Sequence, residues 1–368
     1  KTTDYGRTWT SIAAGLPADE MARSIREDIV RPGLLYLGTE RGVWVSFNGG
    51  KDWRKLQRNL PAVQVSDLAV TANDLVIATH GRSFWVLDNI GVLRQLESGA
   101  PRTERLFAPA PAVREVDEGV AIDYFLPTRP KTLALDILGP DGALIQSFAG
   151  NPVEPKKDEK KDDEDNDPFK PKPKPTTTMK PGLNRFVWKM RYPGFTDFPG
   201  MILWTSRNGG ITAAPGRYQA RLTVDGKSFT QPFEIRTDPR LTNVTQADLV
   251  ARFDFANRVS SRVSQANEAV LLIRGIKEQT AAAAGNASAN AALRTSLGAF
   301  DAKLSAIEGE LYQVRNRSRQ DPLNYPIKLN DKLAGLIGVA ESAEARPTDQ
   351  SEAVFATLSA ELDTIPEP

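Results

Sequence analysis

The sequence contains no cysteine and a single histidine, His80. The missing thiols exclude disulfides, a cysteine nucleophile and cysteine-ligated metals, and one histidine cannot build a multi-histidine metal site. No run of eighteen apolar residues is present that could span a bilayer. The 47 basic and 46 acidic residues leave a net charge of +1, which gives no reason to expect nucleic acid or an anionic membrane as a partner. We therefore expect no metal and no cofactor.

The 368 residues are enough for two or three domains, each with its own core. The sequence has no initiator methionine and starts within a motif. We expect it to be the C-terminal part of a longer protein, with any signal peptide upstream.

Two stretches 44 residues apart share one pattern of a hydroxyl, an Asx, a glycine and a tryptophan. In KTTDYGRTW these residues are Thr2, Asp4, Gly6, Thr8 and Trp9, and in VSFNGGKDW they are Ser46, Asn48, Gly50, Asp52 and Trp53. An Asx side chain can accept hydrogen bonds from the backbone of its own turn, and glycine tolerates positive φ. The tryptophan supplies a large apolar face beneath the turn. The pattern thus predicts a stapled β-turn with a structural role.

A longer similarity links residues 34–50 with residues 74–89. Each stretch has an apolar run, a threonine (Thr39 or Thr79), a polar turn and an aromatic-rich second run. This order predicts strand, turn and strand. Self-similarity at 40 to 50 residues indicates propeller blades or a similar array.

The segment TTDYGRTW resembles the Asp-box (BNR repeat) of bacterial sialidase-type propellers, which is also found in sortilin-type receptor domains and two-propeller xyloglucanases. SFNGGKDW is similar to a degenerate copy, with Asn48 in place of Asp and Asp52 in place of Thr. ATHGRSFWVLDN, PGRYQARLTVDGKSFTQPFEI and DPLNYPIKLNDKLAGLIG resemble the C-terminal region of large exported bacterial repeat proteins labelled sortilin-like or glycosyl hydrolase. The resemblance implies that residues 1–96 are the last blades of a propeller, that upstream blades complete it, and that the boxes are structural.

The remaining sequence divides by composition. Residues 97–118 are rich in Pro, Ala and Arg and indicate a linker. Residues 119–240 contain short alternating runs and hairpin turn signals, which favour an immunoglobulin- or fibronectin-like β-sandwich. Within it, residues 151–181 are charged and Pro-rich, so we expect a disordered loop. Its acidic cluster lacks the glycine and closing glutamate of an EF-hand calcium loop.

From Thr245 the apolar spacing becomes helical. Thr245 and Asp248 resemble a capping box, and two long helices are expected around AAAAGNASAN. Their apolar stripes comprise Leu249, Phe253, Ala256, Val263, Ala266, Val270 and Ile273, then Leu293, Leu297, Phe300, Leu304, Ile307, Leu311 and Val314. Shorter helices are expected over 327–344 and 349–364. Short connections favour antiparallel packing, so residues 241–368 are predicted to form a helical hairpin closed into a four-helix bundle.

The candidate binding residues lie at the predicted turns. His80 and Glu40 occupy matching positions, and Arg41 and Arg82 lie on equivalent turns, so Arg41, His80 and Arg82 are the candidates for contact with a ligand. Each can equally be a solvated turn residue. A glycosidase needs two carboxylates roughly 5 to 10 Å apart, and no spacing in the sequence singles out such a pair. We expect no catalytic residue in this chain.

Three functions remain open. The first is a non-catalytic extracytoplasmic protein whose propeller binds a peptide, a glycan or a partner protein. The second is the C-terminal part of a sialidase- or xyloglucanase-like glycoside hydrolase, with the catalytic residues upstream. The third is a structural tail that closes the propeller. Resemblance of fold alone does not decide between them.

Overall fold

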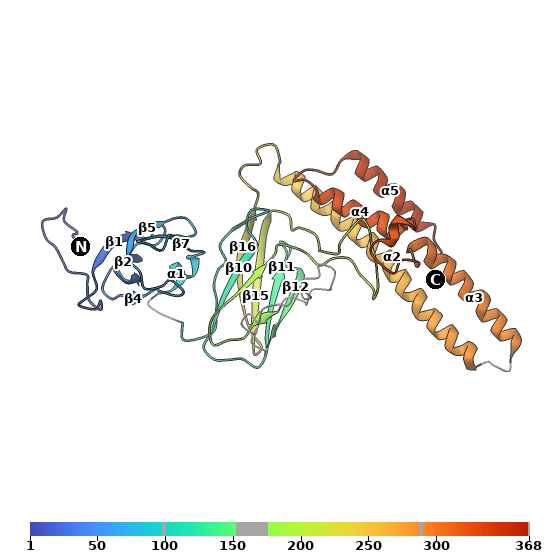
Figure 1. The fold of residues 1–368 in the computed structure, drawn as a ribbon, viewed down its shortest axis with the longest axis horizontal. Helices are drawn as coiled ribbons and strands as arrows, with labels where there is room; N and C mark the ends of the chain where they lie inside the picture. Colours follow the sequence, from blue (N-terminus) through green and yellow to red (C-terminus); the bar gives the residue numbers. More distant parts are fainter. Residues whose placement is uncertain (98–100, 152–175, 287–289, 367–368) are drawn as a thin grey trace. The chain divides into compact units, whose positions relative to one another are not determined.

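The computed structural model describes residues 1–97, 101–151, 176–286 and 290–366. It contains several β-sheets followed by a helical region (Figure 1). The chain divides into two compact units. One comprises Lys1–Ala112, Glu118–Trp188 and Arg217–Glu234, and the other comprises Val113–Asp117, Lys189–Gly216 and Ile235–Pro368. None of the described helices combines the length and the hydrophobicity that a bilayer crossing requires.

Residues 1–97 carry two small antiparallel sheets. The first sheet has the order β1 (Ala22–Glu27), β2 (Leu35–Thr39), β3 (Gly42–Ser46) and β4 (Arg54–Lys55). The second sheet has the order β5 (Val65–Val70), β6 (Leu75–Thr79) and β7 (Phe84–Leu87), and α1 (Gly91–Gln95) follows it. The two sheets share one core, which includes Tyr36, Val43 and Val45 from the first sheet and Leu68 and Ile77 from the second. The pairs β2–β3 and β6–β7 occupy the two predicted strand–turn–strand stretches.

The rest of the first unit is built from two further sheets. The smaller has the order β14 (Gly182–Trp188), β10 (Val120–Leu126) and β8 (Arg105–Leu106). The larger has the order β13 (Thr177–Thr178), β12 (Leu144–Asn151), β11 (Leu133–Leu138), β15 (Gly216–Val224), β16 (Lys227–Arg236) and β9 (Ala112–Val113). Aromatic contacts join the two sheets, with ring centroids 4.5 Å apart for Phe148 and Phe186 and 5.8 Å apart for Trp188 and Tyr218.

Two sequence-based boundaries differ from the structure. The expected linker 97–118 contains β8 and β9, and Leu106 and Phe107 within it are buried. The sequence did not indicate these strands because two residues are too few to show a periodic pattern. Most of the predicted disordered loop, residues 152–175, lies outside the described residues. Its end is ordered: Thr177 is buried in β13, and the Tyr124 hydroxyl donates to the Thr178 carbonyl at 2.6 Å.

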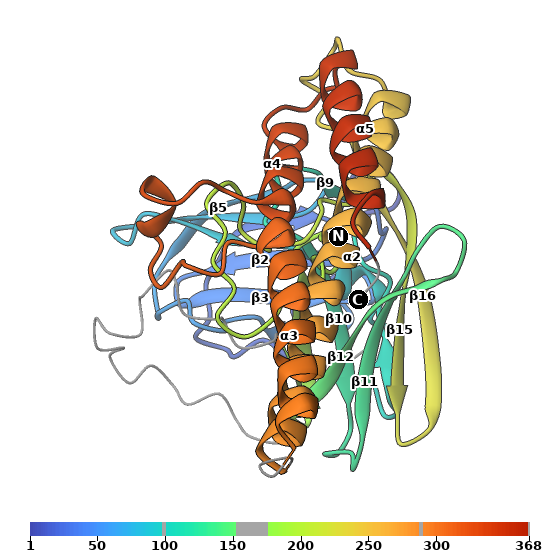
Figure 2. The same ribbon diagram turned by 90° about the vertical axis from the view of Figure 1, so that its right-hand side faces the viewer.

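The second unit contains four α-helices (Figures 1 and 2), namely α2 (Gln246–Asn286), α3 (Ala291–Leu311), α4 (Leu329–Glu341) and α5 (Asp349–Asp363), with a short 3-10 helix at Asp321–Leu323. The capping box at the start of α2 is formed, since the Thr245 amide donates to Asp248 at 3.0 Å and the Asp248 amide donates to the Thr245 hydroxyl at 3.2 Å. The helices pack around α2, whose predicted stripe from Leu249 to Ile273 is buried except for Phe253, which is partly buried.

The predicted stripe of the second long helix is buried only in part. Leu304 and Leu311 are buried, whereas Leu293, Phe300 and Val314 are exposed. Leu293 and Phe300 lie in the first half of α3. Figure 1 shows that α2 and α3 continue past α4 and α5, so this part of the hairpin packs against no other described helix.

Residues 189–216 also differ from the prediction, which placed them in the sandwich. Residues 189–215 form no strand apart from a bridge between Arg191 and Thr212, and the whole segment belongs to the helical unit. Side chains on the helices, such as Asn267 and Asp331, hydrogen-bond the backbone of this segment. The helices thus replace the strand partners that its backbone would otherwise need.

Candidate binding surface

The first box, at Thr2–Trp9, is a closed hydrogen-bonded turn. The Thr2 hydroxyl donates to Asp4 at 2.8 Å and accepts from the Gly6 amide at 2.8 Å. Asp4 also accepts from the Thr8 amide at 2.9 Å and from the Thr8 hydroxyl at 2.7 Å. The hydrogen bonds from Thr8 and Thr2 lower the pKa of Asp4 to about 2. These side chains are fully used in holding the turn.

The second box repeats this arrangement between β3 and β4. The Ser46 hydroxyl donates to Asn48 at 3.0 Å and accepts from the Gly50 amide at 2.9 Å, and Asn48 accepts from the Asp52 amide at 3.2 Å. One bond is reversed. The Asn48 side-chain amide donates to the Asp52 carboxylate at 2.6 Å, whereas in the first box the carboxylate at the matching position accepts.

The two box tryptophans differ in burial. Trp53 is 6% exposed, and its indole Nε1 donates to the Ile12 carbonyl at 2.6 Å. Trp9 is 73% exposed. The second tryptophan therefore fills the role expected of a box, while the first has little to pack against among the described residues.

In each of the turns β2–β3 and β6–β7 a threonine hydroxyl donates to a carbonyl across the turn, although the first turn has two residues between its strands and the second has four. The Thr39 hydroxyl donates to the Gly42 carbonyl at 3.0 Å, and the Thr79 hydroxyl donates to the Ser83 carbonyl at 2.6 Å. These bonds place Arg41 on the first turn and His80 and Arg82 on the second, so the structure puts the three candidate residues at equivalent turns of two neighbouring sheets.

Acidic side chains neutralise most of the arginines near these turns. Arg41 forms an ion pair with Asp19 at 2.6 Å, and Arg23 pairs with Glu40. The hydrogen bond and charge of Arg41 hold the pKa of Asp19 below its usual value. Arg41 is therefore engaged within the chain, although its side chain remains about half exposed.

A second polar cluster lies where β1 meets β5. Asp67 accepts from the Ser24 hydroxyl at 2.7 Å and from Arg26 at 2.6 Å. The hydrogen bonds from Ser24 and the Leu68 amide, together with Arg26, lower the pKa of Asp67. A general acid needs a raised pKa to carry a proton at neutral pH. Asp19 and Asp67 have the opposite shift, so neither suits that role.

His80 and Arg82 are exposed, and within residues 1–97 neither side chain has a partner. The Arg82 carbonyl accepts from Trp85 Nε1 at 2.9 Å, which fixes the backbone beneath the guanidinium. An unpaired guanidinium on a fixed turn can bind a carboxylate, sulfate or phosphate with two parallel hydrogen bonds. This turn therefore has free capacity to bind an anion.

One buried ion pair was not predicted from the sequence. Arg94 on α1 donates to Asp28 at 2.9 Å, and Asp28 follows β1. Arg94 also donates to the Thr71 carbonyl, next to the second sheet, at 3.0 Å. The pair thus ties the two sheets together. No sequence spacing indicates a contact between residues 66 positions apart.

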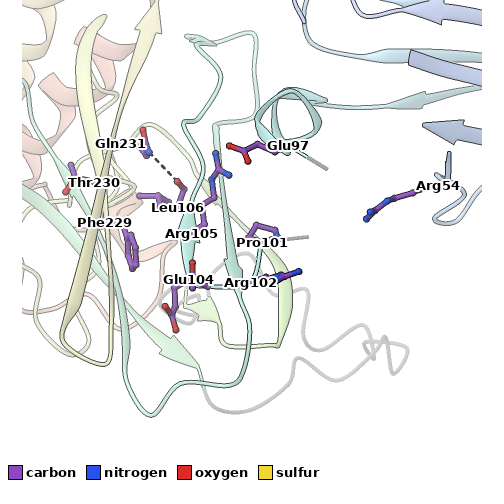
Figure 3. A pocket seen from close by; sticks show the side chains of 11 residues that line it. Arg54, Glu97, Pro101, Arg102, Glu104, Arg105, Leu106, Phe229, Thr230 and Gln231 are labelled. Atoms are coloured by element: carbon purple, nitrogen blue, oxygen red, sulfur yellow. Dashed lines mark hydrogen bonds between the residues drawn. The ribbon is translucent and has the colours of Figure 1, made fainter. Parts of the chain in front are cut away.

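The side chains drawn in Figure 3 line a polar hollow, mostly from β8, the residues before it and β16, with Arg54 from β4. Gln231 Nε2 donates to the Leu106 carbonyl at 3.3 Å, and Lys227 lies 3.8 Å from Glu104. The Arg105 guanidinium lies over the Phe107 ring, 5.1 Å from its centroid. These contacts engage Glu104, Arg105 and Gln231 within the chain. Among the described residues, no group of three or more metal-ligating side chains is placed to hold an ion.

Comparison with known proteins gives little further guidance. No family model and no curated protein matches the sequence. One similar solved structure is the extracellular domain of BT4673, a proposed hybrid two component system from B. thetaiotaomicron, with 11% sequence identity and a TM-score of 0.17. The match covers 61% of this chain and 26% of that one, so this chain spans about a quarter of the protein it matches.

Proposed function

We propose that the chain is part of a non-catalytic, extracytoplasmic binding or scaffold protein. In this proposal residues 1–96 are two neighbouring blades of an Asp-box β-propeller, completed by further repeats, and the turn end of the blades binds a peptide, a glycan or a partner protein. Support for the blade assignment comes from two adjacent sheets, each with a threonine hydrogen bond across its matching turn, and from two boxes with matching hydrogen bonds.

The turn around Arg82 carries the proposal. Its guanidinium and the His80 imidazole are exposed without a partner among residues 1–97, while Arg41 and Arg26 are already paired with carboxylates. The nearby carboxylates Asp19 and Asp67 have lowered pKa values, which favours recognition over acid catalysis. We therefore expect a ligand that presents an anionic group.

Calorimetric titration tests this proposal with two anionic probes, a hexaglutamate peptide and a galacturonic acid oligomer, and with neutral maltohexaose as the comparison. At least one anionic probe should bind. Arg82→Ala should lower the affinity for that probe about ten-fold or more, since a charge-assisted hydrogen bond contributes about 1.5–3 kcal/mol. Arg82→Lys should restore part of the affinity. Arg58→Ala, at an exposed arginine outside these turns, is the matched control.

Two results would count against the proposal. The first is that neither anionic probe binds better than maltohexaose, or that Arg82→Ala binds as the unmodified chain does. The second is release of reducing ends from either oligosaccharide, which would favour the glycoside hydrolase instead.

A further inference from the structure

Two asparagines in the sequence are followed by glycine, Asn48 by Gly49 and Asn208 by Gly209, and in both cases a second glycine comes next. An asparagine before glycine is the pair that loses its side-chain amide most readily without an enzyme, because glycine has no side chain to hinder attack by its backbone nitrogen. The two sites therefore have the same intrinsic reactivity. Asn48 lies in the second box, whereas Asn208 lies in the helical unit.

The reaction has two steps. In the first, the backbone nitrogen of the glycine bonds to the side-chain carbonyl carbon Cγ of the asparagine, the bond between Cγ and Nδ2 breaks, and ammonia leaves with the amide proton. In the second, water opens the resulting succinimide ring at either carbonyl carbon and leaves aspartate or isoaspartate. Water is the only other reactant. The side chain and the glycine amide must first leave their hydrogen bonds, so these bonds distinguish the two sites.

The second box holds both reacting groups at Asn48. Asn48 Oδ1 accepts from the Ser46 hydroxyl at 3.0 Å and from the Asp52 amide at 3.2 Å, and its Nδ2 donates to the Asp52 carboxylate at 2.6 Å. The Gly49 amide, which would be the attacking group, donates to the Gly33 carbonyl at 2.8 Å, in the turn before β2. Reaction at Asn48 therefore requires the whole box to open.

Asn208 is held by fewer bonds. Among the described residues its side chain makes one hydrogen bond, from Nδ2 to the Phe195 carbonyl at 2.6 Å. The Gly209 amide donates to the Arg207 carbonyl at 2.8 Å, only two residues back. Asn208 and Gly209 are exposed, and Gly210, with a φ of 77°, adds backbone freedom next to them. A local opening of this short loop thus frees both reacting groups.

We propose that Asn208 is a site of spontaneous deamidation in the folded chain and that the second box protects Asn48 from the same reaction. The inference is independent of the proposed function, because neither asparagine belongs to the turn around Arg82.

Deamidation at Asn208 removes a contact that holds the loop. An aspartate has no N–H to donate to the Phe195 carbonyl, and one of its oxygens takes the place of the nitrogen that lies 2.6 Å from that carbonyl oxygen. Two oxygens at that position repel each other. Residues 207–210 line a hollow of about 10 Å³ together with Ser260 on α2 and Ile337 on α4. Deamidation should therefore loosen the loop over these two helices.

Peptide mapping by mass spectrometry tests the inference after incubation of the folded chain at mildly alkaline pH. Deamidation at Asn208 should be about ten-fold or more faster than at Asn48, since each ten-fold difference corresponds to about 1.4 kcal/mol in the free energy of local opening. In concentrated guanidinium chloride the two sites should react at similar rates, because both have the sequence Asn-Gly-Gly. The unfolded chain is thus the matched control.

Two variants separate the two sites. Gly209→Ala should slow the reaction at Asn208 and leave Asn48 unchanged, and the loop has room for the added Cβ, whose nearest neighbour is the Arg207 carbonyl oxygen at 4.0 Å. Ser46→Ala removes the hydroxyl that binds Asn48 Oδ1, so it should speed the reaction at Asn48 several-fold and leave Asn208 unchanged. Circular dichroism checks that both variants are folded.

Several results would overturn the inference. They are a folded chain in which Asn48 reacts as fast as Asn208 or in which Asn208 does not react, a difference that persists in denaturant, and a Ser46→Ala variant that leaves Asn48 protected.

Hydrogen exchange of Asn208→Asp tests the loosening separately. The Tyr192 amide donates to the Ile211 carbonyl at 2.8 Å, next to the loop, and should exchange faster in this variant. Asn257→Asp, at an exposed asparagine on α2, is the matched control and should leave this exchange unchanged. Equal exchange in Asn208→Asp and the unmodified chain would show that deamidation does not loosen the loop.

Discussion

The reversed hydrogen bond in the second box makes a strong test of how the boxes work. In the first box a carboxylate at the third position accepts from a hydroxyl at the seventh, Asp4 from Thr8 at 2.7 Å. In the second box an amide at the third position donates to a carboxylate at the seventh, Asn48 to Asp52 at 2.6 Å. Each box therefore keeps one negative charge and one short bond. We infer that the two positions are coupled, so that replacing Asn48 by Asp is unfavourable while Asp52 remains.

The change to make is Asn48→Asp. It removes the charge-assisted bond to Asp52, which contributes about 1.5–3 kcal/mol in typical cases. It also places two carboxylates together, and two unit charges about 4 Å apart repel by about 1 kcal/mol in water. Because Asp52 is exposed, solvent screening reduces both contributions. We expect the box to lose about 1–3 kcal/mol of local stability at neutral pH.

The double variant Asn48→Asp/Asp52→Thr rebuilds the first box within the second. It should return to within about 1 kcal/mol of the unmodified chain, which gives a coupling free energy of about 1–2 kcal/mol in a double-mutant cycle. Asp52→Thr alone should have a small effect, since the Asn48 amide can still donate to a hydroxyl. Hydrogen exchange of residues 42–56, followed by mass spectrometry, reports the local opening free energy and avoids the several transitions of a multidomain chain.

The pH dependence of hydrogen exchange in Asn48→Asp provides a second test of the coupling. Two adjacent carboxylates raise the folded-state pKa of the pair above the unfolded value. The shared proton therefore stabilises Asn48→Asp below the unfolded pKa, and this stability is lost as the pH rises through the folded pKa. The loss of local stability in Asn48→Asp should therefore be smaller near pH 4 than at neutral pH. Two results would refute the coupling. The first is equal hydrogen exchange of residues 42–56 in Asn48→Asp and the unmodified chain at pH 7. The second is a double variant whose local stability is no higher than that of Asn48→Asp alone.

Three further predictions follow from burial and charge. Arg94→Met should destabilise the two-sheet region by about 3–5 kcal/mol in chemical denaturation, because it leaves the Asp28 carboxylate buried and unpaired. Leu304→Ala should destabilise the helical unit by about 2–5 kcal/mol, whereas Leu293→Ala, at an exposed position of the same helix, should have almost no effect in the same assay. Because the pKa of Asp4 is lowered in the folded state, its contribution to the stability of the first box should be complete above the unfolded pKa of about 4 and should disappear as the pH falls through the folded value of about 2. Amide hydrogen exchange of residues 4–8, measured as a function of pH, tests this. Loss of protection already near pH 4 would contradict it.

The sequence was most informative where one short segment determines its own structure. The box turns use hydrogen bonds that span four residues, so their spacing is visible in the chain. The capping box at Thr245 is local in the same way. The candidate surface was only partly predictable. Arg41 and Arg82 could be placed on turns, but the pairing of Arg41 with Asp19 joins residues 22 positions apart and depends on how the strands bring their ends together.

Residues 189–216 were assigned to the wrong unit for a related reason. Several polar residues occupy buried helix positions, and they interrupt the apolar pattern from which packing is predicted. Asn267 donates to the Thr196 carbonyl at 2.7 Å, and Asp331 accepts from the Trp204 amide at 2.8 Å and the Thr205 amide at 3.0 Å.

Each of these polar side chains has a backbone group of the segment as its partner. Glu341 continues the series by accepting from the Thr212 amide at 2.7 Å, and its hydrogen bonds with Thr212 and its pairing with Arg191 hold its pKa below the usual value despite burial. Removing the segment would leave these groups buried without partners, at about 1–3 kcal/mol for each neutral group and more for the charged ones. The helices and residues 189–216 must therefore fold as one unit, and a boundary at residue 240 would separate groups that stabilise each other.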